Sequence, residues 1–272
     1  MILPPKDNSS YALITGATSG MGLEYARKLC RAGYNLIIVS RNGLKTDEVA
    51  KELRGQTLTP DQEILPLGID LSEFDSAESV FEAVGARRVD ILINNAGVLM
   101  YQDLTETPEA RITAIHVLHN VTPVKLCRRY GAEMKSRGFG YILNISSLSA
   151  WMPYPGMAMY GATKRFTKSF SRSLRVELKD SGVSVTTAYF GAVSTNLFQL
   201  KDSYRRLAIR LRIMITAEKA ARKALNAMFR RRANVMPGTV NHIARPILAI
   251  LPNSFLHFID GKLAGIKFQY ED

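Results

Sequence analysis

The stretch that decides the fold is YALITGATSGMGLEYARKL, residues 11–29. Its first five residues are apolar and predict a short β-strand, and the segment from Leu23 onwards predicts a helix. Between them, Gly16, Gly20 and Gly22 follow a Gly-x-x-x-Gly-x-Gly spacing. Glycines let the backbone approach a pyrophosphate, and a helix N-terminus supplies amide donors and the positive end of its dipole. This order predicts a dinucleotide-binding turn, although any one of these glycines could serve a tight turn alone.

Apolar strands and helical stretches alternate along the rest of the chain. Strands are expected near residues 11–15, 35–40, 64–69, 90–94, 141–146, 184–190 and 234–236. Helices are expected near residues 20–32, 44–54, 75–85, 106–136, 158–181 and 217–230. The pattern predicts an α/β single-domain Rossmann fold over residues 1–272, a doubly wound seven-stranded parallel sheet with helices on both faces. Ligands bind such sheets at the carboxyl ends of the strands.

A second informative group lies in the middle of the chain. Tyr160 and Lys164 are four residues apart in YGATK, so both side chains lie on one face of a helix. Ser147 ends the apolar run YILNISS, which predicts a buried parallel strand. A fixed ammonium favours phenolate and lowers an intrinsic tyrosine pKa of about 10, so the phenol could serve as a proton donor. By itself, the Tyr-x-x-x-Lys spacing is more often ordinary helix surface.

Together these elements resemble the short-chain dehydrogenase/reductase family over about residues 10–235. The stretch NNAG at residues 94–97 matches the family's Asn-Asn-Ala-Gly motif. Asp70 matches the aspartate that caps the adenine pocket, and Gly191 and Thr195 match the Pro-Gly-x-x-x-Thr stretch that meets the nicotinamide carboxamide. The chain is most similar to the bacterial subgroup near the hydroxysteroid dehydrogenases and 3-ketoacyl reductases.

The resemblance implies a role for each matched residue. Tyr160 would protonate the oxygen of a ketone that receives hydride from nicotinamide, and Ser147 would orient and polarise that oxygen. Lys164 would bind the nicotinamide ribose and lower the tyrosine pKa. The implied cofactor-binding residues are Thr15, Gly16, Thr18, Ser19, Gly20, Met21, Gly22, Ser40, Arg41, Asp70, Leu71, Asn94, Ala96, Gly97, Tyr160, Lys164, Gly191, Val193 and Thr195. No metal ion is implied.

The residues after the second expected strand bear on which cofactor binds. A carboxylate there would accept hydrogen bonds from the ribose hydroxyls and repel a 2′-phosphate. The strand leads instead into Ser40 and Arg41. A guanidinium can meet a phosphate with two charge-assisted hydrogen bonds. NADP(H) is therefore the expected cofactor, and the alternative is that Arg41 is a solvated surface arginine.

Two positions depart from the family pattern. Phe190 stands where the family usually has proline, so we expect a local change in the floor of the nicotinamide pocket. His119 stands where the family has an asparagine that helps to hold a water in a proton relay, and Asn120 follows it. One helical position is about 100° of rotation, so Asn120 could serve only if the helix shifts register. Alternatively, His119 holds the water and its titration makes turnover pH-sensitive, or it only packs between helices.

Composition bounds the remaining features. No run approaches the ~20 apolar residues of a membrane-spanning helix, and the first residues lack the apolar stretch of a signal peptide. Cys30 and Cys127 have no metal or redox spacing, so free thiols are expected. A cytoplasmic protein is therefore expected. Family analogy implies a homodimer or homotetramer through the two long helices, near 106–136 and 158–181.

The positive charge is concentrated near the C-terminus. Residues 196–272 hold 14 Lys and Arg against 5 Asp and Glu, within a net charge of +12 for the chain. In the family this region begins with a mobile segment over the substrate, so we expect a lid at about 195–216 and a C-terminal extension at about 237–272. The arginines could meet an anionic substrate tail or a membrane surface, although a solvated basic face is the commonest explanation.

The function expected from the sequence is NADP(H)-dependent interconversion of a ketone and a secondary alcohol. A hydrophobic substrate of the steroid, bile acid or fatty-acyl type is favoured. One alternative is a cofactor-binding regulatory protein with weak or no catalysis. The other is a basic surface-binding protein, for which peripheral membrane contact through the C-terminal part is expected. The chain has no nucleic-acid-binding motif, so no nucleic acid partner is expected.

Overall fold

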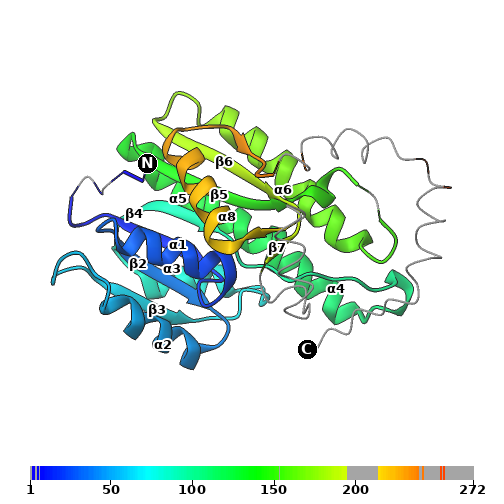
Figure 1. Ribbon diagram of the computed structural model, residues 1–272, viewed down its shortest axis with the longest axis horizontal. Coiled ribbons are helices and arrows are strands. Elements are labelled where there is room, and N and C mark those ends of the chain that lie inside the picture. Colours follow the sequence, from blue (N-terminus) through cyan, green and yellow to red (C-terminus); the bar gives the residue numbers. More distant parts are fainter. Residues whose placement is uncertain are drawn as a thin grey trace.

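The computed structural model describes residues 2, 3, 5, 7–152, 154–194, 214–238, 241, 252 and 254. Seven strands form one parallel sheet in the order β3-β2-β1-β4-β5-β6-β9 (Figure 1). These strands are β1 (Tyr11–Thr15), β2 (Asn35–Ser40), β3 (Ile64–Gly68), β4 (Val89–Asn94), β5 (Gly140–Ser147), β6 (Val183–Phe190) and β9 (Asn234–Val235). The strand order reverses direction at β1, so the predicted doubly wound topology is confirmed.

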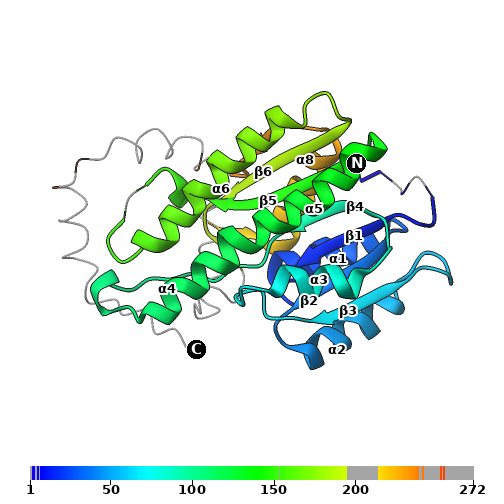
Figure 2. The ribbon, with the colours of Figure 1, turned by 180° about the vertical axis from the view of Figure 1, so that it is seen from behind.

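Helices cover both faces of the sheet. One face carries α1 (Gly20–Cys30), α2 (Gly43–Arg54) and α8 (Ala217–Phe229) (Figure 1). The other face carries α3 (Ser76–Val84), α5 (Thr122–Arg137) and α6 (Ala158–Glu177) (Figure 2). Successive strand side chains enter opposite cores, as Leu13 and Ile14 do. The central strands are therefore apolar on both faces, which is why they form continuous hydrophobic runs in the sequence.

The long helix expected near 106–136 is divided into three parts. They are α4 (Glu109–His116), a π-helical turn η2 (Val117–Val121) and α5. Pro123 lies at the start of α5 and has no N–H to give to the carbonyl four residues before it, that of His119. A π turn inserts one residue into the helix and so rotates the residues after it about the helix axis. The register shift on which a role for Asn120 depends is thus present.

A short strand pair lies beyond the end of β6 and was not expected from the sequence. It joins β7 (Val193–Ser194) to β8 (Ile215–Thr216) in parallel. Most of the expected lid, residues 195–213, lies outside the described residues, as does nearly all of the expected C-terminal extension. Within the described ranges, no helix has the length and apolar character needed to cross a membrane. Cys30 and Cys127 are buried free thiols.

Candidate active site

The three catalytic candidates meet at the carboxyl end of β5. Ser147 is the last residue of this strand, and Tyr160 and Lys164 lie on the first turns of α6, which packs against β5 and the short helix that follows it. The Lys164 ammonium lies 5.5 Å from the centre of the Tyr160 ring and 3.5 Å from the Ile145 carbonyl oxygen. The strand end and the helix face therefore bring the serine, the phenol and the ammonium to one place.

Burial dominates the protonation of this group. It raises the pKa of Tyr160, and a hydrogen bond with Ser147 opposes that rise. The pKa of Lys164 is lowered to about 8, also because the side chain is buried. The net change in the Tyr160 pKa is therefore upward, whereas the sequence led us to expect a decrease caused by Lys164, and that role of Lys164 stays a prediction. The phenol consequently stays protonated at neutral pH, as a proton donor requires.

The glycine turn is held against the end of β4. Gly16 has a φ of +65°, and a Cβ on Gly22 would lie 1.9 Å from the Gly16 carbonyl oxygen, so neither position accepts a side chain. The Thr15 hydroxyl accepts hydrogen bonds from the amides of Asn95 and Ala96 at 2.9 and 3.0 Å. The Asn95 side chain donates back to the Thr15 and Gly16 carbonyls at 2.9 and 3.2 Å. The sequence-based site omitted Asn95, although its place in the Asn-Asn-Ala-Gly motif was a signal.

The end of β2 lies beside the glycine turn. The hydroxyls of Thr18 and Ser40 are 2.9 Å apart and join the two segments. Ser19 precedes α1, and its exposed side chain makes no capping hydrogen bond. Arg41 is exposed and has no hydrogen-bond or ion-pair partner within the described part of the chain. Its guanidinium is available to a phosphate at this position.

The other proposed cofactor residues differ in how their side chains are engaged. The Asp70 carboxylate accepts from the amide and hydroxyl of Ser72, at 2.9 and 2.6 Å. Leu71 is buried. The Asn94 side chain donates to Asn144 Oδ1 at 2.8 Å and to Cys127 Sγ at 3.2 Å, beneath the site. Because that side chain faces the interior, Asn94 could contact a dinucleotide only through its backbone.

The segment after β6 forms the remaining side of the site. Phe190 is buried in the core on the α1 and α8 face, together with Val193. A Cβ on Gly191 would lie 2.7 Å from Asn241 Oδ1, so the glycine leaves room for this asparagine. Thr195, the last of the predicted nicotinamide residues, lies outside the described residues.

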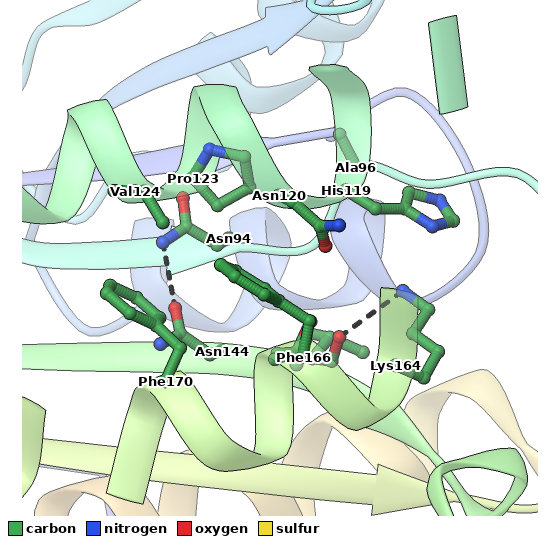
Figure 3. Close-up of a pocket in the computed structure, with 12 residues that line it drawn as sticks. Asn94, Ala96, His119, Asn120, Pro123, Val124, Asn144, Lys164, Phe166 and Phe170 are labelled. Carbon is green, nitrogen blue, oxygen red and sulfur yellow. Dashed lines mark hydrogen bonds between the residues drawn. The ribbon is translucent and has the colours of Figure 1, made fainter. Parts of the chain in front are cut away.

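A small cavity of about 20 Å³ lies between η2, α5, β5 and α6 (Figure 3). It is lined by Asn94, Ala96, His119, Asn120, Pro123, Val124, Asn144, Ile145, Lys164, Phe166, Thr167 and Phe170. The Asn120 amide nitrogen lies 3.1 Å from His116 Nδ1, while its buried Oδ1 has no protein partner in the described ranges. The volume suits about one water molecule. The π turn therefore places a free carbonyl oxygen in the wall that Lys164 also lines.

His119 is engaged at both ring nitrogens. Its Nε2 accepts from the Val98 amide at 3.1 Å, and its Nδ1 lies 2.9 Å from the Thr163 hydroxyl. Burial lowers the pKa of His119 well below its ordinary value, and the Lys164 and His116 charges act in the same direction. The hypothesis that His119 holds the relay water and titrates near neutral pH is therefore wrong, because neither nitrogen is free and the ring stays neutral.

We compared the chain with protein-family models and with solved structures. The model of the short chain dehydrogenase family matches residues 10–205. The chain belongs to this family. The structure of a short-chain dehydrogenase from Sphingobium yanoikuyae in complex with NADPH matches with a TM-score of 0.74 and 26% identity, over 97% of this chain and 99% of that one. The structure of a 7beta-hydroxysteroid dehydrogenase, at 23% identity and a TM-score of 0.82, shares the fold over 92% of this chain and 96% of its own.

Two curated relatives come from Danio rerio. Very-long-chain 3-oxoacyl-CoA reductase-A is 32% identical over 206 residues, which are 74% of this chain and 63% of the relative. The 17-beta-hydroxysteroid dehydrogenase type 3 is 34% identical over 190 residues, 68% of this chain and 61% of the relative. This short-chain dehydrogenase therefore spans about three fifths of the length of these relatives. The predicted resemblance to hydroxysteroid dehydrogenases and ketoacyl reductases is confirmed.

Proposed function

We propose that this short-chain dehydrogenase is an NADP(H)-dependent oxidoreductase that interconverts a ketone and a secondary alcohol by hydride transfer. The observation that carries the proposal is the meeting of Ser147, Tyr160 and Lys164 at one strand end of the sheet that also holds the glycine turn. NADPH would supply the hydride. The names of the relatives, a 3-oxoacyl-CoA reductase and a hydroxysteroid dehydrogenase, describe the same type of chemistry.

The protein's own groups would handle the substrate oxygen. The Ser147 hydroxyl would orient and polarise it, and the buried phenol of Tyr160 would donate a proton as negative charge develops there. The Lys164 ammonium would bind the nicotinamide ribose. The free Oδ1 of Asn120 and Lys164 line a cavity suited to one water, through which the phenol would regain its proton. Of the two relay candidates, Asn120 is therefore the one we propose.

We propose a hydrophobic substrate, of the steroid, bile acid or fatty-acyl type. Tyr160 belongs to a buried apolar cluster with Leu99, Met100 and Ile115, and Met157 and Met159 pack against it. An apolar setting around the proton donor favours a ketone with large apolar substituents. Most of the residues expected to form the lid, which would complete the pocket, lie outside the described residues.

The direct test is NADPH oxidation, followed by absorbance, against ketosteroids, keto bile acids, acyl ketones and small diketones, with NADH in parallel. Turnover with an apolar ketone is expected with NADPH and little with NADH. NADPH binding without turnover of any ketone would favour the alternative of a regulatory protein. The predicted cytoplasmic location is a separate expectation, which cell fractionation would test.

The cofactor preference is expected to depend on Arg41. Removing its guanidinium in Arg41→Ala takes away charge-assisted hydrogen bonds to the 2′-phosphate, worth about 1.5–3 kcal/mol. The KM for NADPH should therefore rise about 10- to 100-fold, with the KM for NADH nearly unchanged. Steady-state kinetics with both cofactors would measure this. Lys51→Ala, which removes an exposed positive charge on α2, the helix that follows Arg41, is the matched control. Equal losses with both cofactors would contradict the assignment.

The affinity for NADPH is expected to weaken above about pH 8. Below that pH Lys164 carries its charge, and above it the ammonium, whose pKa burial lowers to about 8, loses its proton and its attraction for the cofactor. Between pH 7 and 9 the Kd should rise up to about tenfold. Titration of NADPH fluorescence would measure it. Tyr160→Phe should retain the same pH dependence, and an affinity that is flat to pH 10 would contradict the role of Lys164.

We propose that two copies associate through α5 and α6. Phe166 and Val176 on the outer face of α6 are 43% and 69% exposed, and Leu118 on η2 and Val124 on α5 are only partly buried. Exposed apolar side chains on adjacent helices suit an interface with a second copy. Light scattering after gel filtration should show a dimer or tetramer, and Val176→Lys should shift it towards monomer. A monomeric parent protein would contradict this proposal.

A further inference from the structure

His119 joins three segments that are distant in the sequence. From the π turn it reaches Val98, in the loop after β4, and Thr163, on the catalytic helix α6. Its ring also packs edge to face against Tyr160, with the ring centres 5.9 Å apart. The side chain is only 3% exposed, so these contacts are made inside the protein.

The hydrogen bonds through His119 run in one direction. The Thr163 hydroxyl donates to the Tyr160 carbonyl oxygen at 2.8 Å, so it accepts at its oxygen from His119 Nδ1–H. The opposite nitrogen, Nε2, then carries no proton and accepts from the Val98 amide. Each group has the partner that it needs only when the imidazole is neutral and protonated at Nδ1. The chain of bonds thus links the Val98 backbone to the Tyr160 backbone.

The loop that carries Val98 fits closely against this ring. A Cβ added to Gly97 would lie 2.9 Å from His119 Nε2 and 3.6 Å from the Lys164 ammonium nitrogen. Gly97 therefore lies directly over both side chains. It belongs to the Asn-Asn-Ala-Gly stretch proposed to contact the cofactor, so the ring lies between that loop and the proton donor.

We propose that His119 is a positioning residue that holds the cofactor-facing loop at Gly97 and Val98 in place relative to the phenol of Tyr160. The inference rests on the proposed function, in which Tyr160 is the proton donor and Gly97 faces the cofactor. The rigid imidazole ring accepts from the Val98 amide at one end and donates to the Thr163 hydroxyl at the other, so it holds both segments at once. Open-chain amides can hold only one of them from this position.

Two amide variants separate the two ends of the ring. In His119→Gln the side-chain oxygen reaches the place of Nε2 and still accepts from the Val98 amide, but the bond to Thr163 is lost. In His119→Asn the amide nitrogen takes the place of Nδ1 and keeps Thr163, but the Val98 amide loses its acceptor. Loss of one buried hydrogen bond corresponds to an effect of about tenfold.

The expected results differ between these variants. His119→Gln should keep the Kd for NADPH within about twofold of the parent value and lower kcat about tenfold. His119→Asn should raise the Kd for NADPH about tenfold and change kcat at saturating cofactor by less than about threefold. Cofactor fluorescence gives the Kd, and ketone reduction gives kcat. A merely structural role would raise the Kd and lower kcat together in both variants, and that result would overturn the proposal.

Two variants of Thr163 test the same proposal in case the His119 variants do not fold. Thr163→Val removes the hydroxyl but keeps the His119 ring and the shape of a fully buried side chain. It should lower kcat about tenfold with unchanged NADPH affinity, while Thr163→Ser should behave as the parent. Parent-like kcat in Thr163→Val would overturn the proposal. A parent protein that binds NADPH and reduces no ketone would count against the proposed function, and the NADPH affinities of the two His119 variants would then decide the inference.

Discussion

Replacing Tyr160 with phenylalanine is expected to lower kcat for ketone reduction about 100- to 10,000-fold while NADPH affinity stays unchanged. The substitution removes only the phenol oxygen. The ring, which is 8% exposed and packs against His119, keeps its place. Without the hydroxyl, the oxygen that receives negative charge has no acid beside it. Single-turnover and steady-state reduction with NADPH, together with a cofactor titration, would measure both quantities.

Tyr130→Phe is the matched control for this change. Tyr130 is a buried tyrosine on α5 whose hydroxyl has no hydrogen-bond partner in the described part of the protein. Its removal should leave kcat unchanged and cost no stability, because no hydrogen bond is lost. If Tyr160→Phe retained more than a tenth of the parent kcat, another group would have to be the proton donor and the proposed mechanism would fail.

Replacing Asp90 with alanine is expected to lower the free energy of unfolding by about 3 kcal/mol. The Asp90 carboxylate is 1% exposed and accepts from the Ser10 hydroxyl at 2.7 Å, from Arg88 at 2.7 Å and from Arg137 at 3.3 Å. Breaking a buried ion pair leaves charges without compensation and typically costs about 3–5 kcal/mol. The two arginines are partly exposed and keep other acceptors, which favours the lower end of this range.

Urea unfolding of this variant would test the expectation. Asp7→Ala removes the exposed partner of Arg88 and should lower the free energy of unfolding far less than Asp90→Ala does, which makes it the matched control. Asp90 is the second residue of β4, at the amino ends of the strands and away from the candidate active site. Activity of the folded protein at low temperature should therefore be unchanged. Equal losses for Asp90→Ala and Asp7→Ala would show that the buried carboxylate contributes no more than a surface pair.

The order of strands and helices was predictable because it depends on local sequence. The apolar strands have their expected positions to within one or two residues, and the alternation with helices left little choice but a parallel, doubly wound sheet. The catalytic candidates were predictable for the same reason. Tyr160 and Lys164 share a helix face because they are four residues apart, and Ser147 ends a strand that the sheet must carry to the same edge.

The sequence contains a signal that the helix before the active site is interrupted, but it did not predict the register of the residues after the interruption. Pro123 is a local signal that the helix is interrupted, but it does not say whether the chain absorbs the interruption as a kink, a break or an inserted residue. The π turn decides that Asn120 lines the cavity and that His119 turns towards α6. That outcome depends on packing against β5 and α6, which local spacing does not contain.

The partners and protonation of single side chains were decided by the tertiary structure alone. His119 is 21 residues from Val98 and 44 from Thr163, and Asp90 is 80 residues from Ser10. The rise in the Tyr160 pKa reflects burial by several elements at once, which overrode the simple expectation from a nearby lysine. Sequence spacing determines which side chains share a strand or a helix face, because backbone geometry repeats locally. Burial and long-range hydrogen bonds arise only when distant segments pack, so they set the chemistry of the site.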